Sequence, residues 1–328
     1  MTADGNGAAK LAAHVRALAG ERPLGDGVDL ERVGGYRGYA DVMRALADAG
    51  THGGMSVERI GGTAGGQPIF VLQVGPARRE RLSVVMAGVH AMEWIGVEVG
   101  LGLLSRLVAA PPLDRRVLFF PLVNVDGYRH AEADLRAGRR RFARANGRGV
   151  DLNRNWPTHW RPRPFGGRGP LAFLGTAGPH PRSEPEVDAV CRRLDRELLA
   201  GCVIDRAVSL HSFGRMILFP WGGQWRRPMQ VERLRSRGRA VARRITERYR
   251  VTQSSRWVPG SMAFGMELDF LHAHCQADSL LVECSGGGLR IGAPASWLHP
   301  FRWFNPPDPE RVVDQLAPAL EPFVRGQE

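Results

Sequence analysis

The sequence contains a histidine and a glutamate whose types and spacing suit metal binding. His90 and Glu93 form an HxxE motif after an apolar run. A spacing of three places both side chains on the same side of a turn or of a first helical turn, so both can reach one ion. HxxE alone is a weak signal, and two ligands do not hold zinc. A third ligand must therefore come from elsewhere in the chain.

A second histidine can supply this third ligand. His211 lies 118 residues after Glu93 (211 minus 93) and also stands at the end of an apolar run. Two histidines and one glutamate leave the fourth tetrahedral position of zinc open for water, which is typical of a catalytic zinc site. The pattern therefore predicts one zinc ion held by His90, Glu93 and His211.

The elements that must position these residues can be read from the apolar patterns. Strands alternating with helices favour an α/β fold, a three-layer α/β/α sandwich around a mixed, mostly parallel sheet. In open α/β sheets the ligand crevice lies outside the carboxyl ends of the strands. His90, His211 and Glu283 each end an apolar run, so we expect them to meet at one edge. The predicted strands are 55–60, 68–74, 81–90, 116–123, 207–211 and 279–283, with helices over 39–49 and 94–108 and a turn at 124–127.

One catalytic domain after an N-terminal extension is the predicted organisation. Residues 1–35 read as a weakly structured or helical extension, and the regular pattern begins at Tyr36. Residues 36–328 contain no internal repeat and no linker long enough to separate two domains. We therefore expect a single catalytic domain over 36–328.

The composition argues against two classes of partner. The net charge is +12 and the pI about 10.8, but Lys10 is the only lysine and the arginines are scattered along the chain. A nucleic-acid site would instead concentrate Lys and Arg on one element. No apolar run reaches the roughly 18 residues of a membrane span, and residues 1–20 lack the apolar stretch of a signal peptide. We expect a cytoplasmic protein, monomeric by default, that binds neither nucleic acid nor membrane.

Together with further motifs, these residues give the sequence a clear resemblance to the zinc carboxypeptidase family over roughly residues 36–324. The resemblance implies that Glu283 is the catalytic base, which takes a proton from zinc-activated water and passes it to the leaving nitrogen. The same His₂Glu zinc coordination is known from carboxypeptidase A. The motifs that follow the family's order lie at 88–95, 124–128, 149–156, 183–186, 209–212, 218–222 and 281–283.

The resemblance also implies how a peptide substrate is held. Asn153 and Arg154 would bind the terminal carboxylate, because a guanidinium is a planar and permanently charged fork. An arginine of the 136–148 segment would stabilise the oxyanion of the tetrahedral intermediate. Arg144 is the first candidate for this role, and Arg141 is the second.

The resemblance further implies that Leu268 sets the preference for the side chain of the substrate's C-terminal residue. An apolar residue there implies an apolar or aromatic C-terminal residue in the substrate. A shift of one position would instead place Glu267 or Asp269 in the pocket and favour lysine or arginine.

Two positions depart from the family's pattern. Phe213 stands two residues after the third ligand, where a tyrosine is usual. No tyrosine lies between Arg250 and Glu283, and Ser261 occupies the position of the mobile tyrosine that normally covers the substrate carboxylate. We predict a zinc carboxypeptidase that cleaves the C-terminal amide bond of a peptide with a free carboxylate. Two alternatives stay open: a zinc amidase or deacylase acting on a cell-wall or natural-product amide, and a non-catalytic binding protein on this scaffold.

Overall fold

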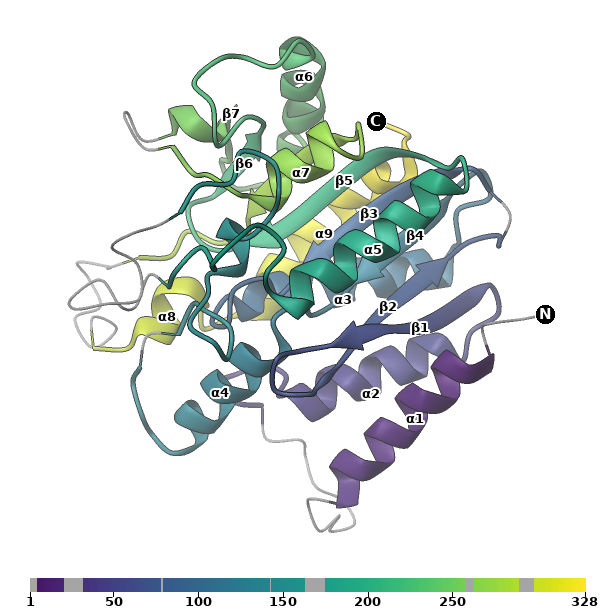
Figure 1. Cartoon of the computed structure of the whole chain (residues 1–328), viewed down its shortest axis with the longest axis vertical. Helices are drawn as coiled ribbons and strands as arrows, with labels where there is room; N and C mark the ends of the chain where they lie inside the picture. The colour runs from purple at the N-terminus through teal and green to yellow at the C-terminus, as the bar shows by residue number, and fades with distance from the viewer. Residues whose placement is uncertain are drawn as a thin grey trace.

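One mixed eight-stranded sheet forms the centre of the computed structural model, which describes residues 5–20, 32–77, 79–141, 143–162, 175–257, 262–288 and 298–328 (Figure 1). The strand order is β1-β2-β4-β3-β5-β8-β6-β7, and the four strands β4, β3, β5 and β8 are mutually parallel. The strands are β1 (Met55–Gly62), β2 (Pro68–Val74), β3 (Arg81–Ala87), β4 (Arg116–Phe120), β5 (Val203–His211), β6 (Met216–Phe219), β7 (Arg250–Gln253) and β8 (Asp278–Glu283).

Helices cover both faces of this sheet, which confirms the predicted three-layer α/β/α sandwich. In Figure 1, α5 lies in front of the sheet, and α3 and α9 lie behind it. None of the described helices has the length and apolar character needed to span a membrane. The α-helices are α1 (Gly5–Gly20), α2 (Tyr39–Gly50), α3 (Trp94–Ala109), α4 (Val125–Arg136), α5 (Pro185–Leu199), α6 (Val231–Ala242), α7 (Glu267–Ala273), α8 (Pro300–Phe304) and α9 (Pro309–Arg325), with short 3₁₀ helices η1 (Leu152–Arg154) and η3 (Ser254–Arg256).

The central strand β3 shows how the layers are held together. Successive side chains of a strand point to opposite faces. Leu82 and Val84 therefore pack on the α5 side, whereas Val85 packs on the α3 and α9 side. Ser83 also faces α9, and its buried hydroxyl donates to the Val324 carbonyl at 2.6 Å. β3 is buried on both faces, as its continuous apolar run predicts.

β3 ends earlier than predicted, at Ala87 rather than at position 90. Gly88 follows in the left-handed region with a φ of 63°, and a Cβ there would lie 2.4 Å from a methyl group of Leu122. A residue without a side chain is therefore required at this position. The turn at Gly88 places His90 beyond the carboxyl end of β3.

The N-terminal segment contributes a helix to the core. Within the predicted 1–35 extension, residues 5–20 form α1, which packs against α2 and β1. Leu11 of α1 is buried and belongs to the main apolar core.

Candidate metal centre

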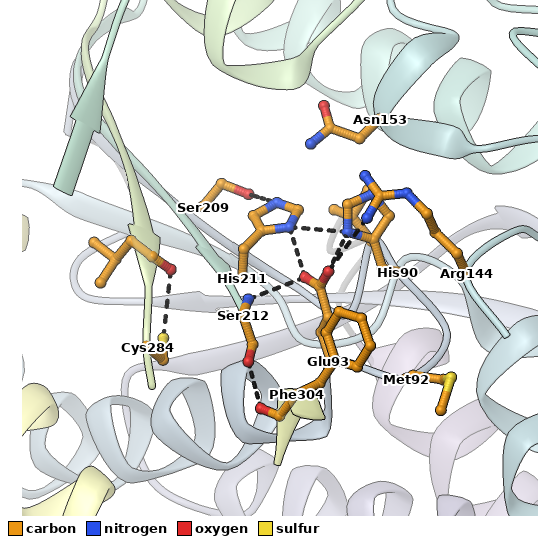
Figure 2. A network of polar contacts seen from close by, with 12 residues as sticks. His90, Met92, Glu93, Arg144, Asn153, Ser209, His211, Ser212, Cys284 and Phe304 are labelled. Carbon is orange, nitrogen blue, oxygen red and sulfur yellow. Dashed lines mark hydrogen bonds and ion pairs between the residues drawn. The ribbon is translucent and has the colours of Figure 1, made fainter. Parts of the chain in front are cut away.

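The three predicted metal ligands converge at the carboxyl end of the parallel strands (Figure 2). His90 lies in the turn after β3, Glu93 directly precedes α3, and His211 is the last residue of β5. All three side chains are buried. Glu93 Oε1 lies 2.7 Å from His90 Nδ1, and Glu93 Oε2 lies 2.8 Å from His211 Nδ1. The two Nδ1 atoms are 3.2 Å apart.

The chemistry of these donor atoms fits a zinc ion. His90 Nε2 lies 3.1 Å from an oxygen of Asp151, and His211 Nε2 lies 2.7 Å from an oxygen of Glu267. An ionised carboxylate only accepts hydrogen bonds, so each Nε2 donates, and a neutral imidazole then presents a lone pair at Nδ1. Tetrahedral ligands at zinc–nitrogen distances of 2.0–2.1 Å would lie about 3.3 Å apart. The separation of the two Nδ1 atoms matches this arrangement.

Charge in the cluster favours binding of a cation. Although burial lowers the pKa of His211, the carboxylates of Glu267 and Glu93 outweigh burial and raise it to about 10. Burial opposes ionisation of Glu93, but His90 and His211 hold its pKa well below its usual range. The site therefore retains a positive charge beside Glu93, either as a proton on His211 or as a metal ion that replaces it.

A residue far along the chain fixes the turn that carries His90 and Glu93. Asn305 is fully buried, and its side-chain amide donates to the Met92 carbonyl at 2.6 Å. Its oxygen accepts from the backbone N–H of Ile95 at 2.9 Å, which satisfies a donor in the first turn of α3. Asn305 thus holds the chain on both sides of Glu93.

Glu283, the predicted base, is the last residue of β8 and the register partner of His211 on β5. Its side chain is partly exposed, whereas its Oε2 atom is buried and has no hydrogen-bond partner among the described residues. Burial raises the pKa of Glu283, and the charge of Glu93 adds to this effect, giving a value of about 8. A cation in the cluster would favour the charged carboxylate.

Arg144 approaches the same cluster from the segment after α4. Its Nε donates to Asp151 at 2.8 Å, and its Nη1 lies 3.6 Å from Glu93 Oε1. Asp151 therefore holds both His90 and Arg144. Arg141, the second candidate for the oxyanion role, is exposed and forms no ion pair with the cluster in the described part of the chain.

Asn153 and Arg154 lie beside this network, on η1. The Asn153 backbone N–H donates to Asp151 at 3.0 Å, and its side-chain oxygen accepts from the Glu267 backbone N–H at 3.3 Å. Arg154 is partly exposed, and its guanidinium donates to the Asn153 carbonyl at 2.5 Å. The two residues predicted to bind a carboxylate are thus adjacent and tied to the ligand network.

The three positions considered for side-chain preference have different surroundings. The Leu268 side chain is fully buried in a small apolar cluster with Leu218 and Leu281. Glu267 contacts His211, as described above. Asp269 accepts hydrogen bonds from the backbone N–H groups of Gly222 and Gly223, each at 2.8 Å, and from His159.

The hydroxyl groups of the four tyrosines all contact groups other than the three metal ligands. Each side chain is buried. The Phe213 ring, at the first departure from the family pattern, packs edge-on against Phe304. Ser261, at the second, lies outside the described residues. The tyrosine hydroxyls contact the Pro306 carbonyl (Tyr36), His14 (Tyr39), the Arg37 carbonyl (Tyr128) and the Cys284 carbonyl (Tyr249).

Sequence reasoning missed two carboxylates that support the ligands, Asp151 and Glu267. Asp151 lies in the 149–156 motif, two residues before Asn153, so its proximity to the site could have been inferred. Glu267 was considered only as a pocket residue. No pattern in the sequence indicates that it contacts His211.

Comparison with known proteins identifies related sequences and folds. The model of the zinc carboxypeptidase family matches residues 40–287. Carboxypeptidase A6 of Mus musculus is 31% identical over 176 residues, which are 49% of this chain and 39% of that protein. Mast cell carboxypeptidase A of Mus musculus is 28% identical over 218 residues, 62% of this chain and 50% of that protein. The chain therefore spans half or less of the length of these curated relatives.

Solved structures share the fold at lower sequence identity. Carboxypeptidase A from Helicoverpa armigera is 19% identical with a TM-score of 0.72, and the match covers 97% of this chain and 79% of that one. A murein-tripeptide amidase from Escherichia coli O157 is 20% identical with a TM-score of 0.53, covering 85% and 95% of the two chains.

Proposed function

The chain belongs to the zinc carboxypeptidase family, and from this premise we propose that it hydrolyses the C-terminal amide bond of a peptide with a free carboxylate. The observation that carries the proposal is the convergence of His90, Glu93 and His211 beside Glu283. Zinc bound by these three ligands would supply an activated water and polarise the scissile carbonyl.

The protein's own residues would carry the protons and the charge. Glu283 accepts a proton from the attacking water and delivers it to the leaving nitrogen, a transfer worth about 10²–10⁴-fold in rate. Arg144 donates hydrogen bonds to the carbonyl oxygen as negative charge develops there. Its contact with Asp151 at 2.8 Å supports this role, because the guanidinium is held in place before substrate arrives.

Asn153 and Arg154 would bind the terminal carboxylate of the substrate, and the apolar cluster that contains the buried Leu268 would set the preference for the substrate's C-terminal side chain. Both acids beside Leu268 already have partners within the protein, which supports an apolar rather than a basic preference. The expected substrates are therefore short peptides that end in an apolar or aromatic residue.

The deciding experiment is an assay of short peptides with free and with amidated C-termini. Protein of known metal content is tested before chelation, after chelation and after zinc is restored. We expect release of one C-terminal residue from free peptides only, lost on chelation and regained with zinc. Equal hydrolysis of amidated peptides would contradict a carboxypeptidase.

A second candidate is a zinc amidase acting on a non-standard amide. The observation in its favour is that all four tyrosine hydroxyls are engaged with partners within the protein, so none covers a substrate carboxylate as in the family's usual arrangement. The E. coli amidase shows that this fold also occurs in a protein named for murein tripeptides. A zinc-loaded protein that leaves ordinary peptides intact but cleaves murein tripeptide would favour this candidate.

A further inference from the structure

We propose that Glu267 is a positioning residue that orients His211 and strengthens it as a metal ligand; this inference rests on the proposed zinc site. Glu267 is the first residue of α7, which covers the face of the sheet toward which Ser209 and His211 of β5 point. Its Oε1 lies 2.7 Å from His211 Nε2 and 3.1 Å from the Ser209 hydroxyl. The His211 ring is thus held on the side opposite Nδ1, the atom that faces Glu93.

The arrangement repeats on both histidine ligands. Asp151 accepts from His90 Nε2, as Glu267 accepts from His211 Nε2. A carboxylate behind a ligating histidine fixes which nitrogen carries the proton, orients the ring and raises its basicity. Both histidines are therefore fixed by anions rather than by neutral backbone carbonyls.

The two supporting carboxylates differ in how their charge is balanced. Asp151 also accepts from Arg144 at 2.8 Å, so a permanent cation shares its charge. The second oxygen of Glu267, Oε2, is buried and has no hydrogen-bond partner in the described part of the chain. Among the described residues, His211 is the side chain able to carry a positive charge that Glu267 contacts. The negative charge of Glu267 therefore acts on His211, and removing this charge would weaken zinc binding.

Glu267 also connects the metal ligand to the proposed substrate clamp. Its backbone N–H donates to the side-chain oxygen of Asn153 at 3.3 Å. The Asn153 backbone N–H in turn donates to Asp151. A hydrogen-bonded path thus runs from His211 through Glu267, Asn153 and Asp151 to His90. Through this path, the orientation of each member depends on its neighbours.

The test measures zinc affinity by competition with a chromophoric chelator in wild type, Glu267→Gln and Glu267→Leu. Glutamine keeps an acceptor for His211 Nε2 but removes the charge, and leucine removes both. We expect zinc affinity to fall by about 10–100-fold, the range known for residues that support metal ligands, with the larger loss in Glu267→Leu. The cobalt-substituted proteins should show matching changes in their visible spectra.

The matched control is Glu98→Gln in α3. Glu98 is also buried, but it pairs with Arg37 rather than with a metal ligand. It should change thermal stability without changing zinc affinity or the cobalt spectrum. The proposal is overturned if folded Glu267→Gln binds zinc within twofold of wild type, and this variant decides the outcome even if Glu267→Leu does not fold. Because affinity is measured without substrate, a protein that cleaves no peptide would count against the proposed function alone.

Discussion

Glu283 and His211 are direct register partners on the adjacent parallel strands β8 and β5, and each is the last residue of its strand. Neighbouring strands lie roughly 4.8 Å apart. The proposed base is thus held beside a metal ligand by the hydrogen-bond ladder of the central sheet rather than by a loop. Replacing either side chain should leave the position of the other almost unchanged, so the functions of the two residues can be separated by mutation.

Loss of the base should separate metal binding from turnover. In Glu283→Gln we expect kcat to fall by about 10²–10⁴-fold, because the amide cannot accept the proton of the attacking water. Zinc content should stay at the wild-type level, since His90, Glu93 and His211 are intact. Steady-state kinetics and metal analysis of the same sample provide the check. Unchanged turnover in the zinc-loaded variant would remove Glu283 from the mechanism.

The oxyanion role predicts different results for two nearby arginines. Arg144→Gln should lower kcat by about 10²–10³-fold with a smaller effect on KM, because the lost interaction forms mainly in the transition state. Arg141→Gln is the matched control and should have little effect, since Arg141 is exposed. If kinetic measurements gave the reverse result, Arg141 would be the oxyanion donor.

The substrate clamp predicts an effect that depends on the terminal carboxylate. Arg154→Ala should weaken the transition-state interaction with a free C-terminus by about 1.5–3 kcal/mol, the usual loss for a charged hydrogen bond. This corresponds to roughly a 10–150-fold decrease in kcat/KM. The exposed neighbour Arg148→Ala should behave like wild type. An equally small effect of both substitutions on peptides with a free C-terminus would rule out the clamp.

The buried carboxyl group of Glu186, which lies outside the metal cluster, should make the free energy of unfolding depend on pH. Burial of this residue of α5 raises its pKa to about 7, and the charges of Glu184 and Asp126 add to this effect. The folded state therefore binds the proton more tightly than the unfolded state, where the pKa is 4.5. Below pH 4.5, Glu186 does not change the free energy of unfolding. Between pH 4.5 and about pH 7 it lowers this free energy progressively. At about 1.36 kcal/mol per pH unit, the total loss is on the order of 3 kcal/mol.

Glu186→Gln should remove this dependence. Urea denaturation in the presence of chelator should show the variant gaining stability relative to wild type as the pH rises from 4.5 to 7. Glu310→Gln, at an exposed position paired with Arg32, is the control and should not show this trend. A stability difference between Glu186→Gln and wild type that is constant over this pH range would disprove the assignment.

The parts of the fold that were predicted from sequence are those where burial alone determines the pattern. β5 and β8 are buried on both faces, so their apolar runs identified them and their terminal residues, His211 and Glu283. β6 and β7 were missed because each has only four residues, and β7 reads Arg-Val-Thr-Gln, which has no apolar run.

Local polar signals were harder to interpret. The 124–127 segment was predicted as a turn, but Asn124 caps α4 by accepting from the Gly127 N–H at 3.0 Å. Asparagine favours both turns and helix N-caps, so the residue types do not separate the two. The contact between Glu267 and His211 could not be predicted at all, because it joins two elements 56 residues apart with no shared periodicity.

The double hydrogen bond of Asn305 around Glu93 also bears on the order in which the site can form during synthesis. All three metal ligands have been synthesised once the chain reaches His211, and the proposed base follows at Glu283. The turn carrying His90 and Glu93 still lacks its support until residue 305 is available. Chains are made from the N-terminus at about 5–20 residues per second. A nascent chain halted between positions 283 and 305 would thus contain every proposed metal ligand and the base, but not the residue that holds two of those ligands in place.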